Sequence, residues 1–179
     1  MNSSMQIANL ATAHEPHHSG QFLTFSLQGE IYGVHLLNVR EIIGYAQPTR
    51  IPGMPEYMQG VINLRGHGVP VIDLALRFGR PATALHQRSS VVILETGGQV
   101  LGFVVDSVDS VADFAPEQIE PAPSFGTGLR REFVLGMART REGFTVLLDI
   151  GRVFSDDEFA QLEQVSQTGA DETALNAAG

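Results

Sequence analysis

The sequence of 179 residues contains no cysteine and no lysine, and no apolar run in it approaches the length of a membrane span. Without cysteine there is no disulfide, no thiolate metal site and no cysteine nucleophile. A transmembrane helix needs about 18 or more consecutive apolar residues, and a signal peptide needs a basic segment followed by an apolar one. We therefore expect neither a membrane span nor a signal peptide.

The sequence has fewer basic than acidic residues. The formal net charge is −9, and residues 155–179 carry acidic but no basic side chains. The body, residues 21–154, is nearly neutral, and all its basic residues are arginine. A neutral body with an acidic end is poorly suited to the phosphate backbone of nucleic acids. Arginine is favoured over lysine at protein interfaces, so the composition favours a protein that binds other proteins.

The chain is rich in glycine, with 19 residues, and contains short runs of Val, Ile and Leu. Such runs separated by Gly- and Pro-rich turns predict an all-β fold. After the last run, Ser155 and Glu158 have the spacing of a capping box, which predicts a short helix over residues 155–165. Residues 1–20 and 166–179 show no periodicity, and we expect a flexible N-terminal tail and a disordered acidic C-terminal tail.

The second half of the body resembles the first. Gly33 corresponds to Gly102 at a shift of 69 positions, and Asp73 corresponds to Asp149 at a shift of 76. Apolar runs and further glycines match at the same two shifts. The repeat predicts two copies of one unit with about five strands each. We expect a first lobe over about 21–85 and a second over about 86–154, sharing one core because each copy is small.

The stretch from Met58 to Gly79 has two apolar runs around a polar corner, Asn63 to Gly68. Gly66 and Gly68 allow a positive φ, which predicts a hairpin. Arg65 lies at this corner. It could be an ordinary solvated charge, but a tight turn would hold its guanidinium at a fixed place on the surface, and that suits recognition.

A search for catalytic motifs finds no phosphate loop, nucleophile elbow, zinc-protease motif or dinucleotide fingerprint. His67 has no carboxylate near it in sequence. Asp73 and Asp149 could form an acid–base dyad, but their repetition favours a structural role at the end of each strand. Four further histidines are His35 and, near the N-terminus, His14, His17 and His18. His35 fits a structural position on a strand, and three histidines in a flexible tail make a poor metal site. We expect no catalytic, cofactor or metal site.

Several segments, in order and with matching spacing, resemble CheW-like chemotaxis coupling proteins. These segments are Tyr32–Tyr45, Gly60–Gly79, Val100–Val111, Pro116–Pro123 and Leu147–Phe154. The resemblance covers about residues 20–165. It implies two five-stranded SH3-like β-barrels packed on a common apolar core. It also implies a cytoplasmic adaptor without enzymatic activity that couples transmembrane chemoreceptors, at membrane-associated arrays, to the regulatory domain of a CheA-type histidine kinase.

The resemblance also implies where the receptor's cytoplasmic tip binds. The positions that match are Val39, Glu41, Asn63, Leu64, Arg65, Gly66 and Val108. Arg65 would be the anchor, and Val39 and Val108 are equivalent positions of the two copies. Kinase-contact residues cannot be assigned. Two other readings stay open: an adaptor of the same fold in another chemosensory-type pathway, such as surface motility or development, and a β-barrel enzyme or small-ligand binder.

Overall fold

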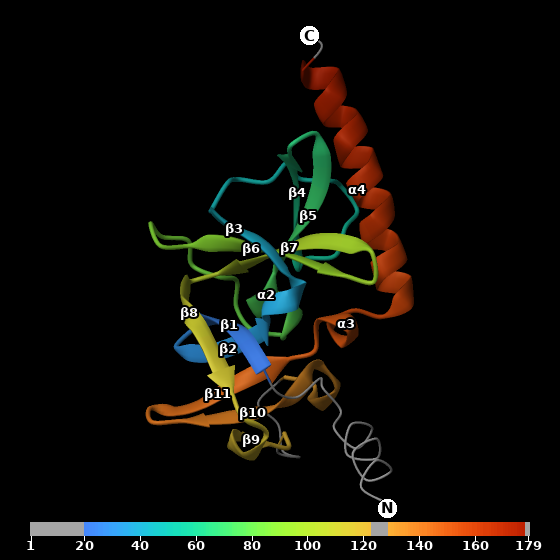
Figure 1. Ribbon diagram of the computed structural model, residues 1–179. Coiled ribbons are helices and arrows are strands. Elements are labelled where there is room, and N and C mark those ends of the chain that lie inside the picture. Colours follow the sequence, from blue (N-terminus) through green and yellow to red (C-terminus); the bar gives the residue numbers. More distant parts are fainter. Residues whose placement is uncertain (1–19, 123–128, 178–179) are drawn as a thin grey trace, which may run out of the picture.

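The structure is a computed structural model that describes residues 20–122 and 129–177, with the backbone alone over 168–177. It consists of two β-sheets and a long C-terminal helix (Figure 1). The expected flexible tail, with His14, His17 and His18, lies outside the described residues apart from Gly20. The rest of the chain can be compared with the expectations above.

Two sheets form the body. The six-stranded sheet has the order β8-β1-β2-β11-β10-β9, and the five-stranded sheet has the order β3-β6-β7-β5-β4. The strands of the first are β1 (Gly20–Leu27), β2 (Glu30–His35), β8 (Ser107–Phe114), β9 (Ile119–Glu120), β10 (Val134–Thr140) and β11 (Gly143–Leu148). Those of the second are β3 (Val39–Gly44), β4 (Met58–Leu64), β5 (His67–Asp73), β6 (Ser90–Thr96) and β7 (Gln99–Val105). The closure of either sheet into a barrel stays a prediction.

Short helical turns connect the strands. They are η1 (Leu36–Asn38), α2 (Leu74–Arg77), η2 (Pro116–Gln118), η3 (Arg131–Phe133) and α3 (Ile150–Val153). The two that follow β5 and β11 begin at the repeated aspartates. Asp73 Oδ1 accepts hydrogen bonds from the backbone N–H of Ala75 and Leu76, and Asp149 Oδ1 accepts one from Gly151. The structural role predicted for the two aspartates is therefore confirmed.

The order of strands confirms the repeat. In one sheet β2 lies parallel to β11 with Gly33 beside Leu147, and in the other β7 lies parallel to β5 with Gly102 beside Val71. These are equivalent pairings, because Gly33 corresponds to Gly102 and Val71 to Leu147. Each copy is, however, divided between the two sheets: β1 and β2 of the first copy pair with strands of the second.

The expected lobes, 21–85 and 86–154, are therefore wrong as structural units. β3, β4 and β5 belong with β6 and β7, so one sheet is built from a continuous stretch and the other from both ends of the body. The physical reason is that the copies complete each other: the chain crosses from one sheet to the other after β2 and again after β7. Sequence similarity identifies equivalent strands but does not say which strands pair.

The core is shared, as expected. The largest cluster of buried apolar residues takes members from both sheets and from the C-terminal helix, among them Phe25 on β1, Leu94 on β6 and Leu162. Two smaller clusters each belong to a single sheet. Because burial of apolar side chains is the main stabilising term, the large cluster holds the two sheets together.

The C-terminal helix α4 (Asp156–Ala177) begins as predicted but is longer. The Ser155 Oγ accepts from the N–H of Glu158, and the Glu158 carboxylate accepts from the N–H of Ser155, which is the capping box. Phe154 packs on Phe159. The expectation of a short helix followed by disorder from residue 166 is corrected: the helical backbone continues to Ala177. The residues after Val165 lack an apolar stripe, but they contain no proline, so a helix that has already started can continue through them.

Candidate functional site

The corner between β4 and β5 is a tight two-residue hairpin. Leu64 pairs with His67, and the two residues between them, Arg65 and Gly66, have φ of 52° and 84°. Two successive positive φ values are typical of a type I′ turn, which matches the twist of the strands. The Asn63 side chain accepts a hydrogen bond of 2.8 Å from the Gly66 N–H. The hairpin is thus confirmed, but its two positive φ values belong to Arg65 and Gly66 and not to Gly66 and Gly68.

Arg65 is not a free side chain. Its Nη1 and Nη2 donate to Oε1 and Oε2 of Glu41 at 2.6 and 3.0 Å, forming a two-pronged ion pair. Glu41 lies on β3, the edge strand at the opposite side of the five-stranded sheet from β4. The hydrogen bond from Arg65 and then its charge lower the pKa of Glu41, and the same pair raises the pKa of Arg65. The Arg65 side chain stays 75% exposed, so the pair is presented at the surface.

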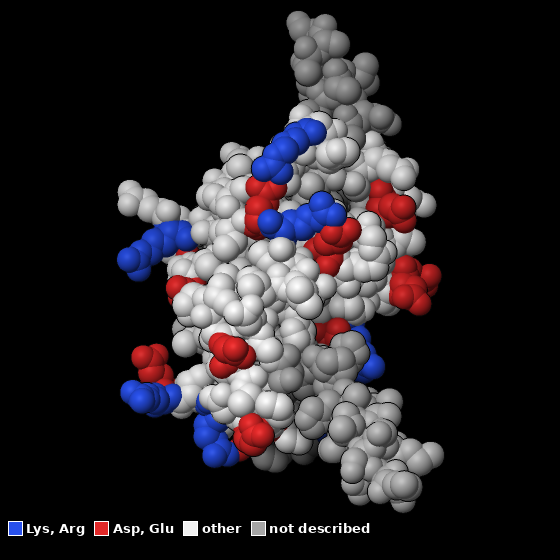
Figure 2. All heavy atoms as spheres, viewed as in Figure 1, with Lys and Arg blue, Asp and Glu red and all other residues white. Residues whose placement is uncertain are grey.

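A cavity of about 350 Å³ adjoins this pair. Glu41, Leu64 and Arg65 line it on one side, and the end of the β6–β7 hairpin and α4 line it elsewhere. Residues expected at the receptor site from two distant segments therefore meet at one place. On the face drawn in Figure 2, acidic and basic side chains are interspersed over the described residues, without a large patch of one sign.

Val39 and Val108 lie apart from that cavity. Each follows a crossing between the sheets and lies at the start of a bulged edge strand, Val39 as the first residue of β3 and Val108 as the second of β8. Val39 pairs with Leu94 on β6, and Val108 pairs with Phe25 on β1. Both are half-buried against the large shared cluster. Their equivalence and partial burial at the junction of the sheets are thus confirmed. A common groove lined by both valines stays a prediction.

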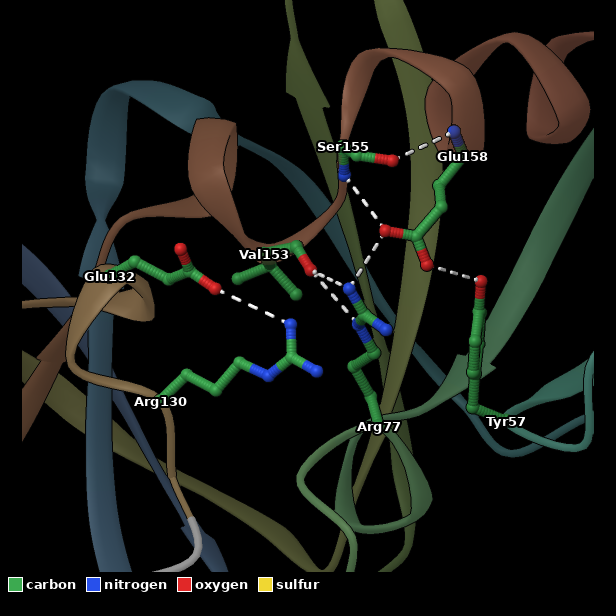
Figure 3. A network of polar contacts seen from close by, with 7 residues as sticks. All are labelled: Tyr57, Arg77, Arg130, Glu132, Val153, Ser155 and Glu158. Atoms are coloured by element: carbon green, nitrogen blue, oxygen red, sulfur yellow. Dashed lines mark hydrogen bonds and ion pairs between the residues drawn. The ribbon is translucent and has the colours of Figure 1, made fainter. Parts of the chain in front are cut away.

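A second polar network, around Arg77 on α2, was not predicted from the sequence. Arg77 donates from Nε and Nη2 to the Val153 carbonyl at 2.9 and 2.7 Å, and its Nη2 also pairs with Glu158 on α4 at 2.9 Å (Figure 3). Its guanidinium lies about 5 Å from the ring centres of Tyr57 and Phe154. In the sequence, only the capping box draws attention to Glu158. Its contacts in this network cannot be predicted from spacing, because the residues involved are up to 101 positions apart.

The chemistry of this network is structural. Burial opposes ionisation of Glu158, but hydrogen bonds from Ser155 and Tyr57 and the charge of Arg77 outweigh it and lower the pKa of Glu158. Burial, and next the hydrogen bond to Glu158, raise the pKa of Tyr57 to about 12. The network therefore ties α2 and α3 to the start of α4 at pH 7.

Within residues 20–122 and 129–167, whose side chains the structure describes, no three His, Asp or Glu side chains come together as a metal site would require. The histidine at the hairpin, His67, is exposed, and the His35 ring packs in a tilted contact on Phe22. None of the helices in the described part of the chain combines the length and the apolar character of a membrane span. What the site offers is an exposed ion pair beside a small cavity, which is an arrangement for recognition.

Comparison with known proteins agrees with the geometry. The model of the CheW-like domain family matches residues 21–158. The "Chemotaxis protein CheW" of Klebsiella aerogenes is 39% identical over 148 residues, covering 83% of this chain and 89% of that protein. The corresponding protein of Treponema pallidum is 31% identical, covering 79% and 86%.

A solved structure gives the same result. The crystal structure of the scaffolding protein TtCheW from Thermoanaerobacter tengcongensis aligns with a TM-score of 0.71 and 35% sequence identity. The alignment covers 81% of this chain and 95% of that one. The fold, the repeated strand pattern and the sequence relatives thus agree, and the chain belongs to the CheW-like family.

Proposed function

We propose that this protein is a non-enzymatic adaptor of chemotaxis signalling that couples chemoreceptors to a CheA-type histidine kinase. The observation that carries the proposal is the match of the CheW-like family over residues 21–158, which is nearly the whole two-sheet body. Relatives named for chemotaxis cover most of their own length in the alignment, so the likeness extends over whole proteins. The adaptor acts in the cytoplasm, beside membrane-associated receptor arrays.

The receptor's cytoplasmic tip binds at the hairpin corner. Arg65 and Glu41 present a rigid pair of opposite charges, and Asn63 and Gly66 fix the backbone beneath it. Leu64 adds an apolar contact at the edge of the cavity. Such a surface suits a partner that offers both charged and aliphatic groups, because paired charges fix register and apolar area supplies affinity.

Val39 and Val108 form the apolar part of the same receptor surface. Each exposes part of its side chain while resting on the shared core. The kinase regulatory domain binds elsewhere on the body, so that both partners are held at once. The family match leaves one alternative, an adaptor of the same fold in a surface-motility or developmental pathway, which would differ in its receptors and not in this geometry.

Separate pull-downs test the proposal. The full chain is incubated with the cytoplasmic-tip fragment of a chemoreceptor from the same organism and, in a second reaction, with the regulatory domain of its CheA-type kinase. Binding of each fragment alone, and of both together, is the expected result. Failure of the chain to bind either fragment, with its fold intact by circular dichroism, would overturn the proposal.

A further inference from the structure

The C-terminal helix forms one wall of the cavity beside Arg65. α4 packs along β5 and β4, and Figure 1 shows it running beside that hairpin. Leu162 and Val165 are the buried residues of the helix, and the hydroxyl of Ser166 donates to the Gly68 carbonyl. These contacts fix the rotation of the helix. Glu163 and Gln167, which follow the same side at the i, i+4 spacing, therefore line the cavity.

The floor of the cavity is aliphatic. It reaches Val69 and Ile93, which belong to the apolar cluster of the five-stranded sheet, and Val100, which packs against that cluster. A volume of about 350 Å³ is near the lower end of small binding sites, so it admits a side chain or two and not a helix. The occupant must therefore combine an apolar part for the floor with a polar end for the rim.

The charges on the rim decide the sign of that polar end. Arg65 pairs with Glu41, and Arg40 pairs with Glu95, so both guanidiniums already have carboxylate partners in their own chain. Glu163 has no such partner among the described residues, and its side chain is exposed. The unpaired charge at this rim is therefore the negative charge of Glu163. A cationic occupant would complete it, whereas an anionic one would compete with Glu41 for Arg65.

We propose that this cavity receives a lysine or arginine side chain of the chemoreceptor tip, with its methylene stem on Val69, Ile93 and Val100 and its charged head at Glu163. Long cationic side chains bury their stems along apolar surface while the head stays at the rim, which is the combination that the cavity offers. The inference rests on the proposed function, because it assigns the occupant of the surface beside Arg65. It makes α4 part of the recognition surface and Glu163 a determinant of specificity.

The test measures the affinity of the receptor-tip fragment for the full chain by calorimetry at two ionic strengths. Glu163→Gln should weaken binding about fivefold, and Glu163→Lys about tenfold or more, with a shallower dependence on salt than the wild type. Asp157→Asn removes an exposed acid from the same helix outside the cavity and should leave affinity unchanged. Thermal unfolding of all variants should be close to wild type, because Glu163 is exposed.

Two results would overturn the inference. The first is that Glu163→Lys leaves the affinity unchanged. The second is that Glu163→Lys raises the affinity, since a gain would mean that the occupant is an anion. Arg65→Ala, measured in parallel, separates this inference from the proposed function. If Arg65→Ala weakens binding while the Glu163 variants do not, the receptor surface stands and the role of α4 fails. If no variant and not even the wild type binds the fragment, the proposed function itself fails.

Discussion

Arg65 holds the Glu41 carboxylate with two hydrogen bonds, of 2.6 and 3.0 Å, and so joins the β4–β5 hairpin to β3. The two residues are the charged members of the expected receptor site, and each limits the freedom of the other. Bidentate pairing of arginine with a carboxylate fixes the plane of both groups. The surface therefore presents a preformed pair and not a single mobile guanidinium.

If the pair acts as a unit, its members should not contribute independently. Arg65→Ala and Glu41→Ala should each weaken receptor-tip binding by about tenfold or more, and the double variant should lose little beyond either single change. Arg65→Lys should recover only part of the affinity, since lysine lacks the planar fork. Calorimetric titration and thermal melts of the variants make the measurement. Losses that add in the double variant, or a variant that unfolds, would contradict this.

Val39 and Val108 should behave as interface residues. Both are half-buried at the edge of the shared core, so a charge at either place can still reach water and the fold should survive. Val39→Asp is expected to weaken receptor binding more than it lowers the melting temperature, and Val108→Asp should do the same. Val111→Asp, on the same strand as Val108 and half-exposed, serves as control. Normal binding by Val39→Asp would remove the valines from the receptor surface.

The Glu158 network gives a prediction for pH. Because the pKa of Glu158 is lowered in the folded protein, its contribution to stability is complete above about pH 4.5 and is lost as the pH falls through the lowered value. For Tyr57 the pKa is raised to about 12, so its contribution is present below about pH 10 and is lost as the pH rises through 12. Tyr57→Phe should cost about 1 kcal/mol at pH 7 and reduce the alkaline loss, of which the raised pKa values of Tyr32 and Tyr45 keep a part. Urea unfolding of the wild type and of Tyr57→Phe at pH 7 and pH 11 measures the cost at neutral pH and the alkaline loss. Equal alkaline sensitivity in wild type and Tyr57→Phe would contradict the assignment.

Gly60 should tolerate no side chain. Its φ is +147°, and a Cβ there would lie 2.2 Å from the Thr49 carbonyl oxygen, which belongs to the backbone and cannot swing away. Gly60→Ala should therefore destabilise the fold by about 2 kcal/mol or more. Gly44→Ala is the control, because a Cβ at Gly44 meets nothing within 4 Å. Equal denaturation midpoints for the two variants would be the contrary result.

The repeat, the two aspartates that begin α2 and α3, and the capping box of α4 could be predicted from the sequence, because those signals are local or depend on matching order. The exchange of strands between the two copies could not be predicted. β2 and β7 have similar sequences, and only packing decides that β2 lies beside β11 and β7 beside β5. The apolar stripe predicts that the helix ends at Val165, whereas the helical backbone of α4 continues to Ala177.

The candidate site was predictable in its residues but not in its contacts. Arg65 was recognised from its turn and from the family resemblance. That it pairs with Glu41, 24 residues away on another strand, follows from the sheet order and not from any spacing in the sequence. The same holds for Glu163, whose place beside the hairpin depends on the burial of Leu162 and Val165.

Reconstituted signalling tests the central claim most directly. Autophosphorylation of the CheA-type kinase is measured with receptor assemblies from the same organism, in the presence and absence of this chain and with Arg65→Ala in its place. Control of the kinase by the receptors should require the wild-type chain and should be largely lost with Arg65→Ala, although that variant still binds the kinase regulatory domain. Receptor control that is equally strong without the chain would contradict its role as the coupling adaptor.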